Sequence, residues 1–154
     1  MVAGWQLAER AHFVEGPELP VGTWTHLALT VTPARLGAGP RWDAVLYVNG
    51  APAASAEGLP DRVDTFNERP FRCGFADVDV DEIRVWRLAR APDALAAGVG
   101  RRLLGSEPGL VGYWRLDERG QIALDYTARG RVGVLGALTT PDPADPSWIL
   151  DGAI

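Results

Sequence analysis

FRCGFADVDVDEIRVWRLAR, residues 71–90, is the stretch that decides the fold. Asp77, Asp79 and Asp81 alternate with valines, and in an extended strand alternate residues project from the same face. Three carboxylates on one face repel one another unless a cation or solvent separates them. The stretch therefore predicts a β-strand whose three aspartates are candidate ligands of a hard metal ion. Ile83 and Val85 would project from the same face as the aspartates if the strand were regular, so apolar and acidic residues would share one face. We therefore expect a β-bulge at Asp81-Glu82, which would separate them.

A β-hairpin signal lies upstream of this stretch. Residues 42–48 (WDAVLYV) have the pattern of a strand, and Asn49-Gly50 follows at once. Asn-Gly favours a type I′ turn because both central residues take a positive φ. Residues 51–56 then form an edge strand, since Pro52 cannot donate a hydrogen bond to a ladder.

The rest of the chain shows the same short-strand pattern. Strands are expected over 24–31, 110–116 and 148–150, and one short helix within 91–104. The 18 glycines and 12 prolines suit a turn-rich β-fold. About seven to nine short strands with regular turn signals predict an all-β protein, a two-sheet antiparallel sandwich of the jelly-roll kind.

Composition excludes several classes of protein. A chain of 154 residues suits one domain. The net charge is −5, every basic residue is arginine and no basic run occurs, so a nucleic-acid role is not expected. No apolar run approaches the roughly 20 residues of a spanning helix, which argues against membrane insertion. MVAGWQLAERAHF has no basic segment followed by an apolar one and is not a signal peptide.

The cysteine and histidines predict no chemistry. Cys73 is the one cysteine, which excludes an internal disulfide, and no basic neighbour in sequence activates its thiol, so we expect a small buried hydrophobe. His26 lies in a strand pattern and is expected to be structural. No Ser/His/Asp set and no phosphate loop can be assembled.

Six tryptophans separate into two groups. Those inside strand patterns are expected in the core, namely Trp24, Trp86 and Trp114. Those near loops or chain ends are the candidate ligand-binding residues, because an exposed indole ring is a platform for sugars: Trp42, Trp5 and Trp148.

Three phrases in order resemble one family. They are GTWTHLA (22–28), LYVNG (46–50) and DEIRVWRLAR (81–90). Together they resemble the laminin G-like, concanavalin A-like jelly-roll domains of bacterial extracellular modules, over residues 13–100.

A second signature lies in residues 107–154. PGLVGYWRLDE (108–118), with Asp125 after it, resembles the segment that opens such modules, although here it follows the closing signature. Two explanations stay open. Residues 1–154 form one compact or permuted domain whose last segment completes the sheets, or the chain spans the end of one module and the start of another.

The resemblance implies a calcium site and a function. It implies Asp81 as a calcium ligand, with Asp79 and Asp77 as further ligands and Asp117 or Asp125 as others, since calcium takes 6–8 oxygens. It also implies a non-catalytic, lectin-like recognition module that binds a glycan or a protein surface and serves adhesion. Such a module is extracellular or at the cell surface as part of a larger protein, while a cytoplasmic origin stays open.

Two other functions stay open. The first is a structural, assembly or adhesin subunit of a larger particle, associated with a neighbouring domain or subunit. The second is a glycoside hydrolase remnant, since retaining enzymes need two carboxyls about 5–5.5 Å apart. The flanking acid in DVDVDE is Asp77 rather than a glutamate. The segments that form the substrate cleft in those hydrolases are also not recognisable in this sequence, so we do not expect an enzyme.

Overall fold

The computed structural model describes residues 2–7, 10–34, 41–59, 71, 73, 78–143, 145–150 and 152–154. The chain divides into two compact units, each made from two separate segments. The first unit comprises Met1–Pro70 and Ala89–Val99, and the second comprises Phe71–Leu88 and Gly100–Ile154.

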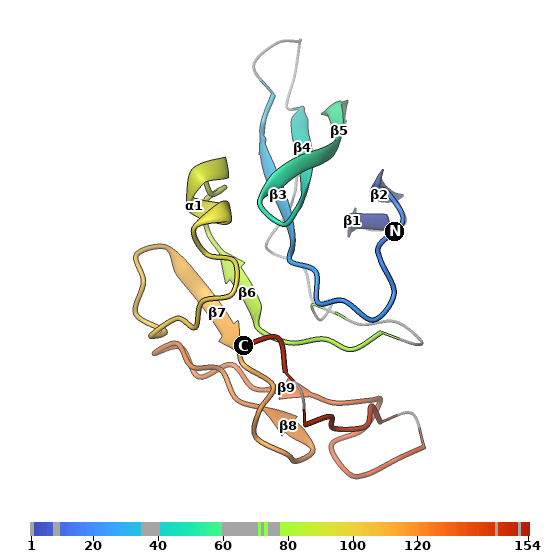
Figure 1. Cartoon of the computed structure of the whole chain (residues 1–154), viewed down its shortest axis with the longest axis vertical. Coiled ribbons are helices and arrows are strands. Elements are labelled where there is room, and N and C mark those ends of the chain that lie inside the picture. Colours follow the sequence, from blue (N-terminus) through green and yellow to red (C-terminus); the bar gives the residue numbers. More distant parts are fainter. Residues whose placement is uncertain are drawn as a thin grey trace. The chain divides into compact units, whose positions relative to one another are not determined.

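The described elements are nine strands and one short helix (Figure 1). The first unit contains β1 (Val2–Leu7), β2 (Arg10–Glu15), β3 (Leu27–Pro33), β4 (Trp42–Val48), β5 (Ala51–Leu59) and α1 (Pro92–Ala96). The second contains β6 (Ile83–Trp86), β7 (Leu110–Trp114), β8 (Ile122–Ala123) and β9 (Gly133–Val134). Every pairing between these strands is antiparallel, as predicted.

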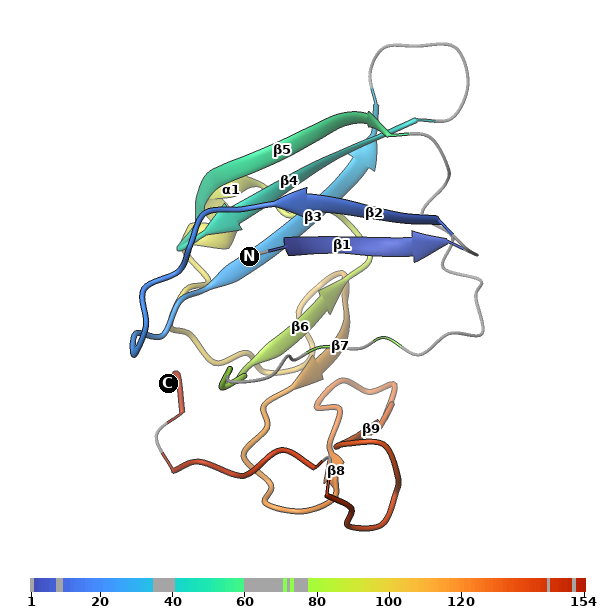
Figure 2. The same ribbon diagram turned by 90° about the vertical axis from the view of Figure 1, so that its right-hand side faces the viewer.

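The core of the first unit lies against one face of the sheet β3-β4-β5. Ala44 and Leu46 alternate along β4, are fully buried, and contact Val14 of β2. Figure 2 shows the β1–β2 hairpin in front of this sheet and α1 behind it. The sheet is therefore covered on both faces, by the hairpin and by the helix that buries Leu95.

The predicted Asn49-Gly50 turn is confirmed. Asn49 has a φ of 50° and Gly50 a φ of 81°, as a type I′ turn requires. The Asn49 side-chain oxygen accepts a hydrogen bond from the His26 backbone N–H at 2.9 Å, which ties β3 to the turn. A Cβ on Gly50 would lie 2.6 Å from the Cα of Ala96, so the helix packs directly on this glycine.

The core of the second unit lies around β7. Tyr113 is completely buried, and Ala123 and Thr127 are buried with it. β7 pairs with β6, and its last residue, Trp114, also forms an isolated bridge with Asp125. The strand of the closing signature thus pairs with the strand of the opening signature.

The acidic stretch differs from the prediction. Asp79 and Asp81 lie outside any strand, and β6 begins only at Ile83. Glu82 has a φ of 55°, in the left-handed region, so the extended run is interrupted by a turn of the backbone and not by a bulge in a strand. Asp77 lies outside the described residues.

Other predictions were wrong in detail. Cys73 is exposed, not buried. Trp24 is 40% exposed because β3 starts three residues later, at Leu27. The segment 148–150 forms no strand. The prediction of one short helix within 91–104 is confirmed: α1 ends at Ala96, since Gly98 follows and Gly100 takes a φ of 64°.

Candidate binding site around Trp148

An open hollow of about 410 Å³ lies in the second unit. It is formed by the turn that leads into β8, by the proline-rich loop after β9 and by the segment near the C-terminus. We call it the Trp148 hollow, and its lining residues are Arg119, Gly120, Gln121, Pro141, Trp148 and Leu150.

The indole ring of Trp148 is held in place by a long-range hydrogen bond. Its Nε1 donates to the carbonyl of Gly120 at 3.1 Å, so the polar edge of the ring is bound to the turn. The ring is half-buried, and Leu150 beside it in the lining is 81% exposed. A fixed aromatic ring with apolar neighbours suits stacking against the apolar face of a sugar.

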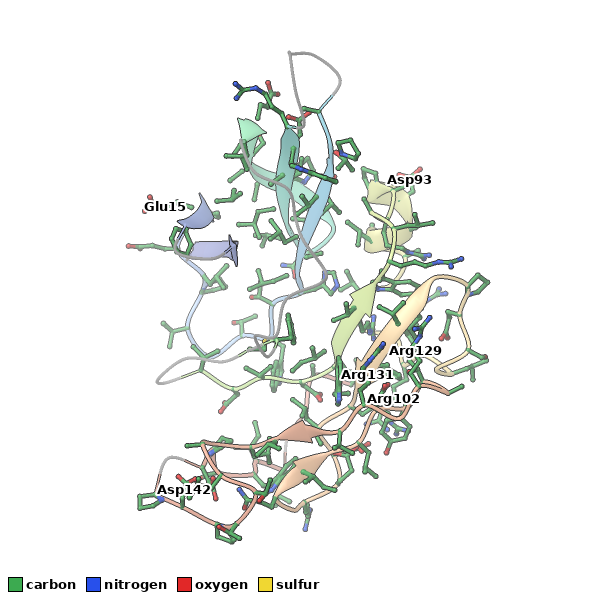
Figure 3. The ribbon with its side chains drawn as sticks, turned by 180° about the vertical axis from the view of Figure 1, so that it is seen from behind. Glu15, Asp93, Arg102, Arg129, Arg131 and Asp142 are labelled. Atoms are coloured by element: carbon green, nitrogen blue, oxygen red, sulfur yellow. The ribbon has the colours of Figure 1, made fainter. Side chains whose placement is uncertain are left out.

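Gln121 and Asp142 hold the surrounding loops. The amide nitrogen of Gln121 donates to the carbonyls of Leu135 at 3.0 Å and Leu138 at 3.4 Å. An Asp142 carboxylate oxygen accepts from the N–H of Leu138 at 3.0 Å, and Figure 3 shows Asp142 in this loop. Side-chain hydrogen bonds to backbone groups therefore hold loops that have almost no regular structure.

Arg119 contributes the charge of the hollow. Its φ is 54°, in the left-handed region, and the residue is exposed. Among the described residues its guanidinium has no hydrogen bond or ion pair.

The structure separates the three predicted tryptophans. Trp148 lines the hollow. Trp42 belongs to β4 in the first unit, where it is half-buried and its Nε1 has no partner among the described residues. Trp5 lies in β1 opposite His12, and its side chain is outside the described part of the chain.

The predicted calcium ligands are placed differently from one another. Asp79 is exposed. Both oxygens of Asp81 accept backbone hydrogen bonds, Oδ1 from Glu82 at 2.9 Å and Oδ2 from Ala153 at 2.7 Å. In the part of the chain that the structure describes, no three His, Cys, Asp or Glu side chains are grouped to hold a metal ion. A calcium site would need ligands beyond these, such as Asp77, and calcium stays a prediction.

A buried polar network lies between β6 and β7. The Glu82 side chain is only 8% exposed; its Oε2 accepts from the Tyr113 hydroxyl at 2.7 Å and pairs with Arg84 at 2.8 Å. Burial, and next the hydrogen bond to Glu82, raises the pKa of Tyr113 above its ordinary value. The tyrosine therefore stays a neutral donor, and the network ties the two signatures together.

The family of the chain follows from a comparison with protein-family models. The model for laminin G-like domains, described as the concanavalin A-like lectin/glucanases superfamily, matches residues 3–96. The chain belongs to this family. The antiparallel all-β architecture with one short helix agrees with the concanavalin A-like sandwich fold. No curated protein and no solved structure gives a significant match.

Membership in this family suggests a carbohydrate- or protein-binding module. Laminin G-like domains are typically non-catalytic, whereas the superfamily also includes glycosidases, and such domains are often extracellular. No described helix is long and apolar enough to cross a membrane.

Of the residues that line the hollow, the sequence indicated only Trp148 as a candidate, and its binding role stays a prediction. Arg119, Gln121 and Leu150 belong to no recognisable motif. Pro141 and the two prolines after it did indicate a loop, and loops commonly carry binding residues. The pairing of Glu82 with Tyr113 was also missed, because the two residues are 31 positions apart.

Proposed function

We propose that this chain is a non-catalytic recognition module that binds a glycan at the Trp148 hollow. The observation that carries the proposal is the indole ring of Trp148, fixed by its bond to Gly120 beside Leu150 and Pro141. Membership in a lectin-related family supports carbohydrate as the ligand class. In the larger protein to which we assign it, the module would work outside the cell.

The acidic stretch supports a non-catalytic role. Glycoside hydrolysis needs two carboxyl groups poised across the scissile bond. Asp79 and Asp81 do not share an extended strand, and both oxygens of Asp81 accept backbone hydrogen bonds. A carboxylate whose two oxygens accept backbone hydrogen bonds is better suited to stabilising the fold than to transferring a proton.

The test is glycan binding by the full chain and by Trp148→Ala. Loss of the ring should weaken binding at least about tenfold, since 1.4 kcal/mol is a factor of ten and an aromatic contact contributes about that much beyond its area. Trp148→Phe should keep part of the affinity. Trp24→Ala is the matched control, because Trp24 is exposed and does not line the hollow. Equal losses in the Trp148 and Trp24 variants would contradict the proposal.

An assembly role is the second candidate. Apolar side chains beside the hollow are exposed, among them Leu138 at 56% and Ile149 at 46%. Exposed apolar groups in one region are typical of surfaces that contact another protein. A stable oligomer in light scattering, together with no glycan binding, would favour this function over recognition.

A further inference from the structure

Arg119 is the one charged residue among those described that line the Trp148 hollow. The other lining residues are a glycine, a glutamine, a proline, a tryptophan and a leucine. A ligand in the hollow therefore meets an apolar ring, exposed aliphatic surface and a single positive charge.

The carboxylates of the neighbouring loop do not neutralise this charge. Asp142 accepts hydrogen bonds from the N–H groups of Ala137 and Leu138, and Asp145 accepts one from the N–H of Asp142. Among the described residues neither carboxylate forms an ion pair with Arg119. Three other arginines of the second unit, Arg84, Arg102 and Arg115, do pair with a carboxylate.

The backbone at Arg119 adds to the argument. A φ of 54° is uncommon for a residue other than glycine. Gly120, the next residue, uses its carbonyl to hold Trp148. The turn at residues 119–120 thus contributes Arg119 to the lining of the hollow and holds Trp148, another lining residue.

We propose that the Trp148 hollow selects glycans that carry an anionic group, which Arg119 binds while the sugar ring stacks on Trp148. A guanidinium matches a carboxylate or sulfate group with two parallel N–H donors. The anionic group of the glycan is a uronate carboxylate or a sulfate ester. Both have the two oxygens that accept the paired N–H donors of the Arg119 guanidinium. This inference rests on the proposed function, because it concerns the same site.

The test compares three oligosaccharides of equal length: a neutral hexose chain, a hexuronate chain and a sulfated hexose chain. We expect the full protein to bind at least one anionic chain roughly three- to tenfold more tightly than the neutral one at low salt. The preference should shrink as the ionic strength rises. Whichever anionic chain binds more tightly identifies the source of the charge.

Arg119→Gln should abolish this preference, because it lowers the affinity for the anionic chains more than the affinity for the neutral chain. Arg119→Lys should keep a weaker preference for anionic chains, since lysine retains the positive charge and lacks the two parallel N–H donors of the guanidinium. Arg129→Gln is the matched control, because Arg129 is an exposed arginine of the same unit that does not line the hollow. Unfolding in urea at the same midpoint shows that each variant is folded.

The two proposals fail in different ways. Equal binding of neutral and anionic chains, with no effect of Arg119→Gln, would overturn the anionic selection and leave glycan recognition standing. Loss of the preference in Arg129→Gln as well as in Arg119→Gln would also overturn it. Absence of any glycan binding, or binding that survives Trp148→Ala, would overturn both.

Discussion

Tyr113 joins three segments of the second unit through one hydroxyl group. The hydroxyl donates to Glu82 at 2.7 Å and accepts from the N–H of Leu103 at 3.2 Å, and the residue is completely buried. Tyr113→Phe keeps the ring and leaves Glu82 and Leu103 each short of a partner. We expect the free energy of unfolding to fall by about 1–3 kcal/mol, the cost of unsatisfied buried polar groups.

Tyr126→Phe is the control for this change. Tyr126 is 37% exposed, and its hydroxyl lies 3.3 Å from Asp117. Water replaces the lost bond there, so the expected loss is within about 0.5 kcal/mol. Urea denaturation of both variants gives the comparison, and similar losses would show that the Tyr113 hydroxyl is not a tie between segments.

Asp125 predicts how stability depends on pH. Burial raises the pKa of Asp125, but the N–H groups of Thr127, Arg131 and Tyr113 and the Thr127 hydroxyl outweigh it and hold the pKa below its ordinary 3.8. In that range the unfolded chain binds more protons than the folded one, so stability rises with pH. The contribution of Asp125 is complete above pH 3.8 and is lost as the pH falls through the lower pKa of the folded state.

Asp125→Asn should flatten this acid limb. We expect the urea midpoint of the full chain to fall between about pH 5 and pH 2, and to fall less in the variant. Part of the pH dependence of stability should remain in the variant because of Glu107. Burial raises the pKa of Glu107, but backbone N–H groups outweigh burial and lower it, so Glu107 also makes stability rise with pH. An acid limb of equal steepness in the variant would show that Asp125 does not carry the effect.

Calcium binding is tested at Asp79 and Asp81. If calcium binds there, titration calorimetry of the full chain should detect uptake that Asp79→Asn weakens. Asp81→Asn should weaken uptake more and also increase hydrogen exchange at the Ala153 amide, which donates to Asp81. Increased exchange in a chain that takes up no calcium would assign Asp81 to holding residues 152–154 alone.

The turn between β4 and β5 shows how one glycine positions an element. Gly50→Ala forces an alanine to adopt a φ of 81° and brings a Cβ to 2.6 Å from Ala96 of α1. The left-handed backbone costs about 1–2 kcal/mol. The clash adds about 1–3 kcal/mol, as over-packing does elsewhere.

Gly22→Ala separates the two effects. Gly22 has a φ of 69°, but nothing lies within 4 Å of the added Cβ. In a urea titration we expect Gly22→Ala to lower the free energy of unfolding only by the cost of the left-handed backbone. Gly50→Ala should lower it further, by the cost of the clash with Ala96. Equal losses in the two variants would mean that α1 moves away at no cost.

Local chemistry explains which elements could be predicted. Asn49-Gly50 was predicted correctly because both residues tolerate a positive φ, whatever surrounds them. The start of α1 at Pro92 was also predicted, since proline suits the first turn of a helix. The acidic stretch was predicted wrongly as a strand, because the alternation of residue types does not reveal the left-handed φ of Glu82. That φ accompanies burial of the Glu82 side chain, which contacts Arg84 and Tyr113.

The candidate site was less predictable than the fold. Trp148 could be selected because it lies near a loop and a chain end, but its proposed role depends on a hydrogen bond to Gly120, 28 residues earlier. Arg119 gave no signal at all, because an exposed arginine in a turn is ordinary. Long-range contacts decide such a site, and spacing along the chain does not encode them.

At the scale of the whole molecule, the order of the two signatures has a structural consequence. The family model matches residues 3–96, whereas β7 and Tyr113 come from the segment after it. β6 has β7 as its partner, and Glu82 has Tyr113 as its donor. A chain that ends after Ser106 therefore retains β6 and Glu82 but removes the strand that pairs with β6 and the tyrosine that donates to Glu82.

We expect this shortened chain to lose amide protection at β6 (Ile83–Trp86) in hydrogen exchange, because an unpaired strand exposes its backbone groups and associates with other chains. Protection at β4 should persist, since β3 and β5 flank β4. A chain that ends after Leu150 is the control, because it keeps the β6–β7 pair. If residues 107–154 instead begin a separate module, β6 will stay protected and the shortened chain monomeric, which decides between the two explanations of the signature order.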